Sequence, residues 1–199
     1  MINRYSENDI DKIVEKLNKN GIISIPTDTV YGLCGKIDSK EVFDKLIKLK
    51  KRPNSKPFSI MCADIDQINE VALVDEKAER IIQNFMPGPI TIILNKQENM
   101  PFYIGNNNTV AIRMATSNCL KETIKKLECP VFMTSANISG NRTCKTIEEI
   151  ENLGLNLDAI VEGKVVYNRA STIVDCTKKE IEIVREGPIS ENEIRNCLL

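Results

Sequence analysis

The hydrophobic pattern of the first fifty residues alternates between helical and strand-like spacing. Apolar side chains recur every three or four positions over residues 10–17, which predicts an amphipathic helix. Its start resembles a capping box made by Ser6 and Asp9. The apolar run 22–25 then predicts a buried strand, and a second amphipathic helix follows Ser39 as its cap. Alternation of this kind is typical of an α/β protein.

The alternation continues to the end of the chain, with strands more closely spaced in the last third. Runs of β-branched or aromatic residues predict strands, and apolar residues at helical spacing predict helices. The predicted strands are 58–62, 90–94, 109–113, 130–134, 159–161, 171–175 and 181–185. The predicted helices begin at Asp75, cover 120–127 and 146–153, and follow Ser190. We therefore expect one α/β domain over residues 1–199, with a twisted, open, mixed sheet flanked by helices.

Composition excludes several classes of function. The 199 residues suffice for one sizeable core, and 27 basic against 28 acidic residues create no overall field that attracts nucleic acid or membrane. The chain has no histidine, which excludes a histidine-based triad and a histidine-ligated metal. The 7 cysteines form no C-x-x-C pair and are expected to be reduced thiols. Without a leader-like start or an apolar run of about 20 residues, we expect a cytoplasmic protein with no membrane segment.

The stretch 24–35, SIPTDTVYGLCG, places polar groups directly after the predicted buried strand. In open α/β sheets, ligands bind at such strand ends. The same stretch also fits an ordinary strand, turn and short helix, in which Asp28 caps the helix while Gly32 and Gly35 supply turn dihedrals. Residues elsewhere in the chain must decide between these two interpretations.

Cations gather at the end of one helix and close one strand. Lys50, Arg52 and Lys56 stand where a helix gives way to a proline-containing loop. They either complement the helix dipole or bind an anion such as a nucleotide triphosphate. Arg113 closes the strand 109–113, where its planar fork suits a carboxylate, a phosphate or a structural salt bridge.

Uncharged hydrogen-bonding groups end another predicted strand at Thr134, Ser135 and Asn137. Asn137 also fits an Asx-turn that stabilises its own loop. Together with the cations, this set contains no acid, base or nucleophile of the usual kinds. It suits a reaction whose substrates bring their own nucleophile and leaving group, while the protein positions them and neutralises charge. Nucleotidyl transfer fits this description, with Mg²⁺ carried on the phosphates and no metal held by protein side chains.

Seven short motifs occur in order along the chain. They are PTDTVYGL at 26–33, KKRPNSKP at 50–57, PGPIT at 87–91, TVAIR at 109–113, TSANISG at 134–140, STIVD at 171–175 and REG at 185–187. In this order they resemble the YrdC/TsaC-like family, the L-threonylcarbamoyladenylate synthases, in its short form and over roughly residues 8–187. The resemblance implies a twisted open α/β sheet around a large, positively charged cavity. It also implies condensation of L-threonine, bicarbonate and ATP to threonylcarbamoyl-AMP and pyrophosphate, with the product passed to tRNA-modifying transferase proteins.

The resemblance also implies roles for individual residues. The positions matched on the ATP side are Lys50, Arg52, Lys56, Thr109, Ser135, Asn137, Thr143 and Arg185. Four of them, Lys50, Arg52, Ser135 and Asn137, would be catalytic. The positions matched around L-threonine are Thr29, Tyr31, Met61, Arg113 and Ser171, with Arg113 on the carboxylate. Met61 stands where relatives often carry a histidine, and ATSN at 115–118 departs from the usual segment.

Two rival functions stay open at this point. One is an RNA-binding module, because the basic cavity of the family has been linked to double-stranded RNA. A net charge of −1, with 4 tyrosines and 5 phenylalanines, leaves room for no more than a local RNA contact. The other is carbamoyl transfer of the kind in which a related domain makes carbamoyl-adenylate, although such domains sit inside much longer chains.

Overall fold

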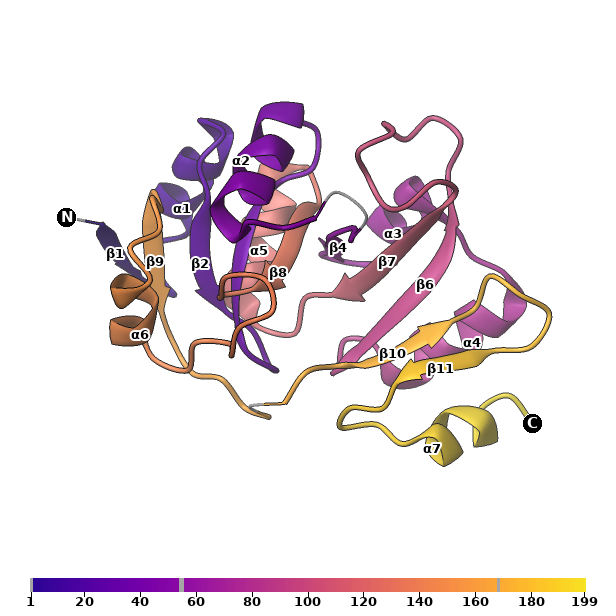
Figure 1. Ribbon diagram of the computed structural model, residues 1–199. Coiled ribbons are helices and arrows are strands. Elements are labelled where there is room, and N and C mark those ends of the chain that lie inside the picture. The colour runs from indigo at the N-terminus through magenta and orange to yellow at the C-terminus, as the bar shows by residue number, and fades with distance from the viewer. Residues whose placement is uncertain (1, 54–55, 168) are drawn as a thin grey trace.

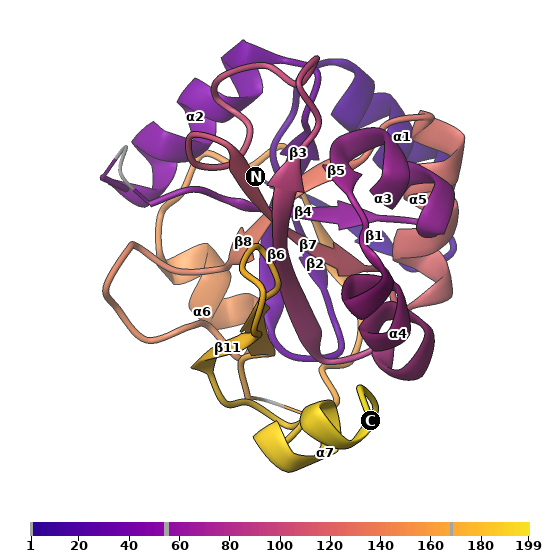
Figure 2. The same ribbon diagram turned by 90° about the vertical axis from the view of Figure 1, so that its right-hand side faces the viewer.

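The computed structural model describes residues 2–53, 56–167 and 169–199, whose strands form a single sheet (Figure 1). The strands are β1 (Asn3–Ser6), β2 (Ile23–Pro26), β3 (Tyr31–Lys36), β4 (Ser59–Cys62), β5 (Ala72–Leu73), β6 (Ile90–Lys96), β7 (Thr109–Met114), β8 (Val131–Ser135), β9 (Ala159–Glu162), β10 (Thr172–Asp175) and β11 (Glu182–Arg185). The helices are α1 (Ile10–Asn18), α2 (Lys40–Lys50), α3 (Ile65–Val71), α4 (Glu76–Phe85), α5 (Asn118–Leu127), α6 (Ile147–Asn152) and α7 (Glu191–Asn196). Helices lie on both sides of the sheet (Figure 2).

The described strands are ordered β1-β9-β2-β3-β8-β4-β7-β6-β10-β11, with β5 paired to β6. Parallel pairs join β1 to β9, β2 to β9, β4 to β7 and β6 to β10. The other neighbours are antiparallel. Because β1 and β11 lie at opposite ends of this order, the sheet is open. Because it contains both parallel and antiparallel pairs, it is also mixed, as the sequence predicts.

The chain after β2 does not form the short helix that one interpretation of the stretch 24–35 predicted. It turns back as β3, which pairs antiparallel with β2 on one side and β8 on the other and is buried along most of its length. Gly32 and Gly35 have no positive φ, so turn geometry does not require them. A Cβ on Gly32 would collide with Sδ of Met133, and one on Gly35 would lie 2.5 Å from Cγ1 of Val42. Both glycines therefore serve close packing.

The helix caps predicted at Ser39, Asp75 and Ser190 are confirmed. In each case the side-chain oxygen accepts the backbone N–H of the residue three positions later. The first helix differs, because β1 occupies the chain up to Ser6 and α1 begins only at Ile10. Here the N–H and the hydroxyl of Ser6 both donate to the Asp9 carboxylate, and no side chain caps the helix.

Buried apolar side chains form two clusters that attach the helices to the sheet. One cluster joins α1 and α5 to strands of the sheet and includes Ile13, Leu17, Leu120 and Ile124. The larger cluster contains buried residues of α2, α3, α4, α6 and α7. The helix α3 and the strand β5 were not predicted, because seven and two residues are too few to show a clear period.

Candidate functional site

A pocket of about 360 Å³ lies against the strands β3, β8, β4, β7, β6 and β10. Register partners such as Gly32 and Ser135, or Thr91 and Ile173, place residues of neighbouring strands on the same face. Three arginines and many small or hydroxyl-bearing residues form the wall. The lining residues are Thr27, Thr29, Val30, Gly32, Arg52, Pro57, Ser59, Thr91, Ala111, Arg113, Met133, Thr134, Ser135, Thr143, Ala170, Ser171, Ile173 and Arg185. The described lining contains no carboxylate, so the pocket favours anions.

The pocket brings together residues from both predicted substrate groups. Thr29, Arg113 and Ser171 come from the group matched to L-threonine. Arg52, Ser135, Thr143 and Arg185 come from the group matched to ATP. These residues belong to separate segments of the chain, and the sheet order gathers them at one place.

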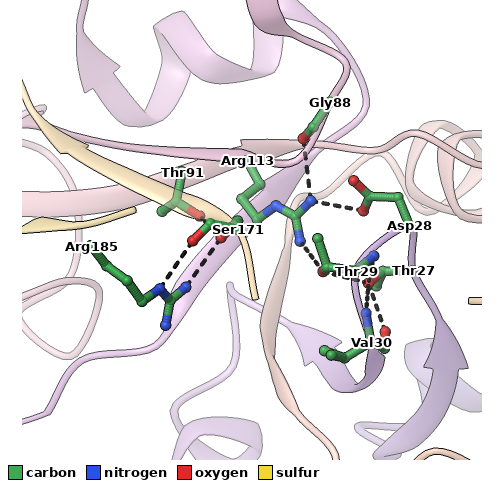
Figure 3. Close-up of polar contacts among 9 residues, drawn as sticks. All are labelled: Thr27, Asp28, Thr29, Val30, Gly88, Thr91, Arg113, Ser171 and Arg185. Carbon is green, nitrogen blue, oxygen red and sulfur yellow. Dashed lines mark hydrogen bonds and ion pairs between the residues drawn. The ribbon is translucent and has the colours of Figure 1, made fainter. Parts of the chain in front are cut away.

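Arg113 near the end of β7 is held by three protein groups (Figure 3). Its Nη2 donates to Oδ1 of Asp28 at 2.7 Å and to the carbonyl oxygen of Gly88 at 3.2 Å. Its Nη1 donates to Oγ1 of Thr29 at 3.0 Å. The sequence interpretation of Asp28 as a helix cap is therefore wrong, since Asp28 is the buried ion-pair partner of Arg113. No sequence pattern could pair two residues so far apart along the chain.

The turn between β2 and β3 is fixed by Thr27. Its hydroxyl donates to the carbonyl oxygen of Val30 at 2.6 Å and accepts the backbone N–H of Val30 at 3.2 Å. It also lies 3.1 Å from the hydroxyl of Thr29. The Thr29 hydroxyl is thereby held between Thr27 and Arg113 at the pocket wall (Figure 3).

Ser171 connects Arg185 to Thr91 on the other side of the pocket (Figure 3). Arg185 donates from Nε to the Ser171 carbonyl oxygen at 3.0 Å and from Nη2 to its hydroxyl at 3.3 Å. The hydroxyls of Ser171 and Thr91 are 2.7 Å apart. Burial, and next the positive charge of Arg113, lower the pKa of Arg185. Arg113 and Arg185 therefore bring two positive charges close together, which an anion between them would stabilise.

Arg52 reaches the pocket from the loop that follows α2. Its Nε donates to the carbonyl oxygen of Lys56 at 2.9 Å, and its Nη2 donates to that of Pro57 at 2.8 Å. The guanidinium carbon lies 4.9 Å from the centroid of the Phe58 ring. Burial lowers the pKa of Arg52. These contacts hold a charged group at the pocket wall.

Lys50 is fully buried behind the pocket rather than in its lining. Its Nζ donates to the carbonyl oxygens of Ser135 and Asn137 at 2.5 and 2.9 Å, and to Oδ1 of Asn137 at 2.7 Å. Three acceptors use all three N–H groups of the ammonium. Burial, and next the charge of Arg52, lower the pKa of Lys50 to about 7. In this conformation Lys50 and Asn137 hold the loop after β8, with Ser135 at the pocket.

Four other residues matched to the family motifs have no place in the lining of this pocket. The hydroxyl of Tyr31 donates to the carbonyl oxygen of Gly163 at 2.8 Å, and Tyr31 lines a separate cavity of about 500 Å³. Met61 is buried in the core beside its register partner Arg113. Lys56 is exposed, and Thr109 begins β7 at the end away from Arg113. Their predicted roles in binding stay predictions.

Sequence reasoning gave no role to several polar residues at the pocket. These are Thr27, Ser59 and Thr91, which all line it. Thr27 and Thr91 lie inside the quoted motifs PTDTVYGL and PGPIT, so the motifs contained a signal. Among the described residues, no cluster of three or more acidic, cysteine or histidine side chains could hold a metal ion. None of the described helices is long and apolar enough to cross a membrane.

Comparison with known proteins places this chain in a family. The Sua5/YciO/YrdC family model, described as "Telomere recombination", matches residues 15–187. A protein of Methanocaldococcus jannaschii, provisionally named a threonylcarbamoyl-AMP synthase, is 33% identical over 202 residues, covering 98% of this chain and 96% of its own. The uncharacterised protein YciO of Escherichia coli K12 is 29% identical over 182 residues, covering 89% and 88%.

Solved structures are similar to this chain over nearly its whole length. Pyrococcus abyssi Sua5, crystallised with L-threonine, has a TM-score of 0.91 at 27% identity and covers 100% of this chain. The present chain spans 61% of the length of that protein. Escherichia coli YciO has a TM-score of 0.88 at 26% identity, with 98% and 100% of the two chains covered. Because the family model matches most of the sequence, the chain belongs to the Sua5/YciO/YrdC family.

Proposed function

We propose that this protein is an L-threonylcarbamoyl-AMP synthase, which condenses L-threonine, bicarbonate and ATP. The observation that carries the proposal is the pocket, where Arg52, Arg113 and Arg185 meet hydroxyl groups and the described lining has no acid or base. The relatives support it, because a Pyrococcus abyssi protein that is 29% identical over 186 residues is named threonylcarbamoyl-AMP synthase. Sua5 of Pyrococcus abyssi, to which this chain is similar in structure, was crystallised with L-threonine.

The reaction needs little acid–base help from the protein. The amine of L-threonine forms a carbamate with bicarbonate, and water is released. A carbamate oxygen then attacks the α-phosphorus of ATP, the bond from that phosphorus to the bridging oxygen breaks, and pyrophosphate leaves with the electron pair. The substrates supply both nucleophile and leaving group, so the protein contributes proximity and charge neutralisation.

The pocket offers groups suited to each substrate. Arg113 and Thr29 would bind the carboxylate and hydroxyl end of L-threonine, and Arg52 with Ser135 would meet the phosphates. Arg185 was matched to the ATP side, but its hydrogen bonds go to Ser171 of the L-threonine side. We therefore place Arg185 between the two substrates, where the carbamate meets the α-phosphate.

Mg²⁺ belongs to this proposal as a companion of ATP. The described lining of the pocket contains no carboxylate, so its side chains do not fit a metal site made by the protein alone. When bound on the phosphates, Mg²⁺ would neutralise part of their charge. A cytoplasmic setting, with transfer of the product to a tRNA-modifying enzyme, completes the proposal. A solved structure of HypF, which is 20% identical to this chain with a TM-score of 0.79, is similar in fold, and no function is inferred from it.

Isotope incorporation tests the proposal directly. Purified protein is incubated with ATP, Mg²⁺, L-threonine and isotopically labelled bicarbonate, and the products are examined by mass spectrometry. We expect an adduct of AMP that carries both the threonine mass and the label. An adduct without the label, or AMP without any adduct, would contradict the proposed reaction.

A further inference from the structure

The second oxygen of Asp28 and one nitrogen of Arg113 stand out in the buried ion pair beside the pocket. Oδ2 of Asp28 and Nε of Arg113 are both buried, and neither forms a hydrogen bond among the described residues. The pair is joined at one point, between Nη2 and Oδ1 at 2.7 Å. Its two side chains are each 7% exposed. A buried pair with one contact gains less than a two-pronged pair, so its geometry needs another explanation.

The hydrogen bonds of Arg113 define which of its groups remain for a ligand. A guanidinium carries five N–H groups. Asp28 and Gly88 use both on Nη2, and Thr29 uses one on Nη1. One N–H on Nη1 and the Nε–H therefore remain. Arg113 lines the pocket and Asp28 does not, so Asp28 holds the guanidinium from the side away from the ligand.

Electrostatics gives Asp28 a second effect on Arg113. Arg185 lies near Arg113, and the positive charge of Arg113, after burial, lowers the pKa of Arg185. Among the described residues, neither Arg52 nor Arg185 forms an ion pair, whereas Arg113 pairs with Asp28. Without Asp28, repulsion from Arg185 would act on a guanidinium held only by neutral oxygens.

We propose that Asp28 is a positioning residue for L-threonine, which fixes the Arg113 guanidinium in the orientation that receives the substrate carboxylate. The inference rests on the proposed function, in which Arg113 binds L-threonine. It assigns to the Asp28 carboxylate, through its position as well as its charge, an effect on one group of the substrate, the carboxylate, and on no other.

The backbone of Asp28 makes the side chain suitable for substitution. Its carbonyl oxygen accepts the backbone N–H groups of Val166 at 3.0 Å and Tyr167 at 2.8 Å. These bonds hold the segment after β9 against the turn between β2 and β3. Because they use the backbone oxygen, exchange of the carboxylate for an amide leaves them in place.

The test compares L-threonine with L-threoninamide, in which a neutral amide replaces the carboxylate. Binding of each compound is measured by calorimetry on wild type, Asp28→Asn and Asp28→Glu. We expect both variants to bind L-threonine about tenfold more weakly while L-threoninamide binding changes little, since one charged hydrogen bond is affected. The dissociation constant of L-threoninamide divided by that of L-threonine should therefore become smaller in both variants.

Asp158→Asn is the matched control. Oδ2 of Asp158 accepts the backbone N–H of Ile22 at 2.8 Å, and Asp158 does not line the pocket. This variant should keep the wild-type affinity for both compounds. An unchanged ratio in the Asp28 variants, a wild-type ratio in Asp28→Glu, or tighter L-threonine binding in Asp28→Asn would overturn the positioning role. If wild type itself does not bind L-threonine, the proposed function fails instead.

A second measurement requires no substitution of Asp28. Proton–nitrogen correlation NMR of the wild-type protein reports the Nε–H of Arg113, assigned by its loss in Arg113→Lys. A guanidinium fixed by Asp28 should give a sharp, slowly exchanging signal before ligand is added. We expect this signal to shift with L-threonine but not with L-threoninamide. A signal averaged by exchange in the free protein would overturn the positioning role.

Discussion

The ammonium of Lys50, at the end of α2, donates a hydrogen bond to Oδ1 of Asn137, in the loop after β8, at 2.7 Å. The same Oδ1 accepts the hydroxyl of Ser135 at 2.8 Å, and Nδ2 of Asn137 donates to the carbonyl oxygen of Asn141 at 2.6 Å. One buried lysine thus fixes the loop that presents Ser135 to the pocket. This role of Lys50 in holding the loop does not depend on any contact with phosphate.

Replacement of Lys50 by methionine should lower the free energy of unfolding. The variant keeps a long apolar stem but removes the ammonium that bridges three oxygens of the loop, and the carbonyl oxygen of Asn137 loses its donor, which costs about 1–3 kcal/mol. Urea unfolding measures the loss. Lys48→Met is the matched control, since Lys48 is exposed on the same helix and should change stability by less than about 0.5 kcal/mol. Equal effects of the two substitutions would show that Lys50 does not hold the loop.

The stability that depends on Lys50 should increase with pH. Burial lowers the pKa of Lys50 from 10.5 to about 7, so the unfolded chain binds more protons than the folded protein between these values. The free energy of unfolding then increases through this window, by at most about 1.4 kcal/mol per pH unit, and is flat below it. The difference between wild type and Lys50→Met isolates this effect. A difference that falls or stays constant from neutral to alkaline pH would contradict it.

Substitutions in the two halves of the pocket should separate the two substrates. Arg113→Lys keeps the charge but loses the planar fork, and should weaken L-threonine binding about tenfold to a hundredfold with little change for ATP. Arg52→Ala should do the reverse, because Arg52 lines the pocket on the side matched to ATP. Calorimetry with single substrates measures both. Equal losses of both ligands in both variants would mean that these arginines support the fold.

Cysteine substitutions should affect stability and leave the chemistry intact. Cys34 is buried in the core, and burial raises the pKa of its thiol far above the usual range, so it is no nucleophile near neutral pH. Cys34→Ser should lower the free energy of unfolding by about 1–3 kcal/mol. The less buried Cys197 is the control for the same exchange. A folded cysteine variant that no longer forms the adenylate would reveal a missed thiol role.

The sequence predicted the parts of the fold that depend on local pattern. Helices with strong 3.6-residue periodicity and the caps at Ser39, Asp75 and Ser190 are present in the structure. The hairpin of β2 and β3 was missed because YGLCGK is buried and pairs with β2 along one edge and with β8 along the other, which propensity does not report. Long-range pairing decides such a segment.

The candidate site was predictable to the extent that its residues lie in the motifs. Arg113 and Thr29 lie together at one pocket, and their roles in binding L-threonine stay predictions. The charge that balances Arg113 was not found. Asp28 follows the buried strand in a sequence that fits a cap equally well, and only the fold brings its carboxylate to β7. Lys50 shows the converse, since a lysine at the end of a helix normally points to solvent whereas this one is buried.

Pyrophosphate release tests the proposed reaction most directly. Purified wild-type protein is incubated with Mg²⁺ and ATP, with L-threonine and bicarbonate added singly and together, and pyrophosphate, ADP and phosphate are measured. Because the carbamate must form before it attacks the α-phosphate, we expect pyrophosphate only when both additions are present. Rapid formation of ADP and phosphate without L-threonine would contradict the account and identify an ordinary ATPase.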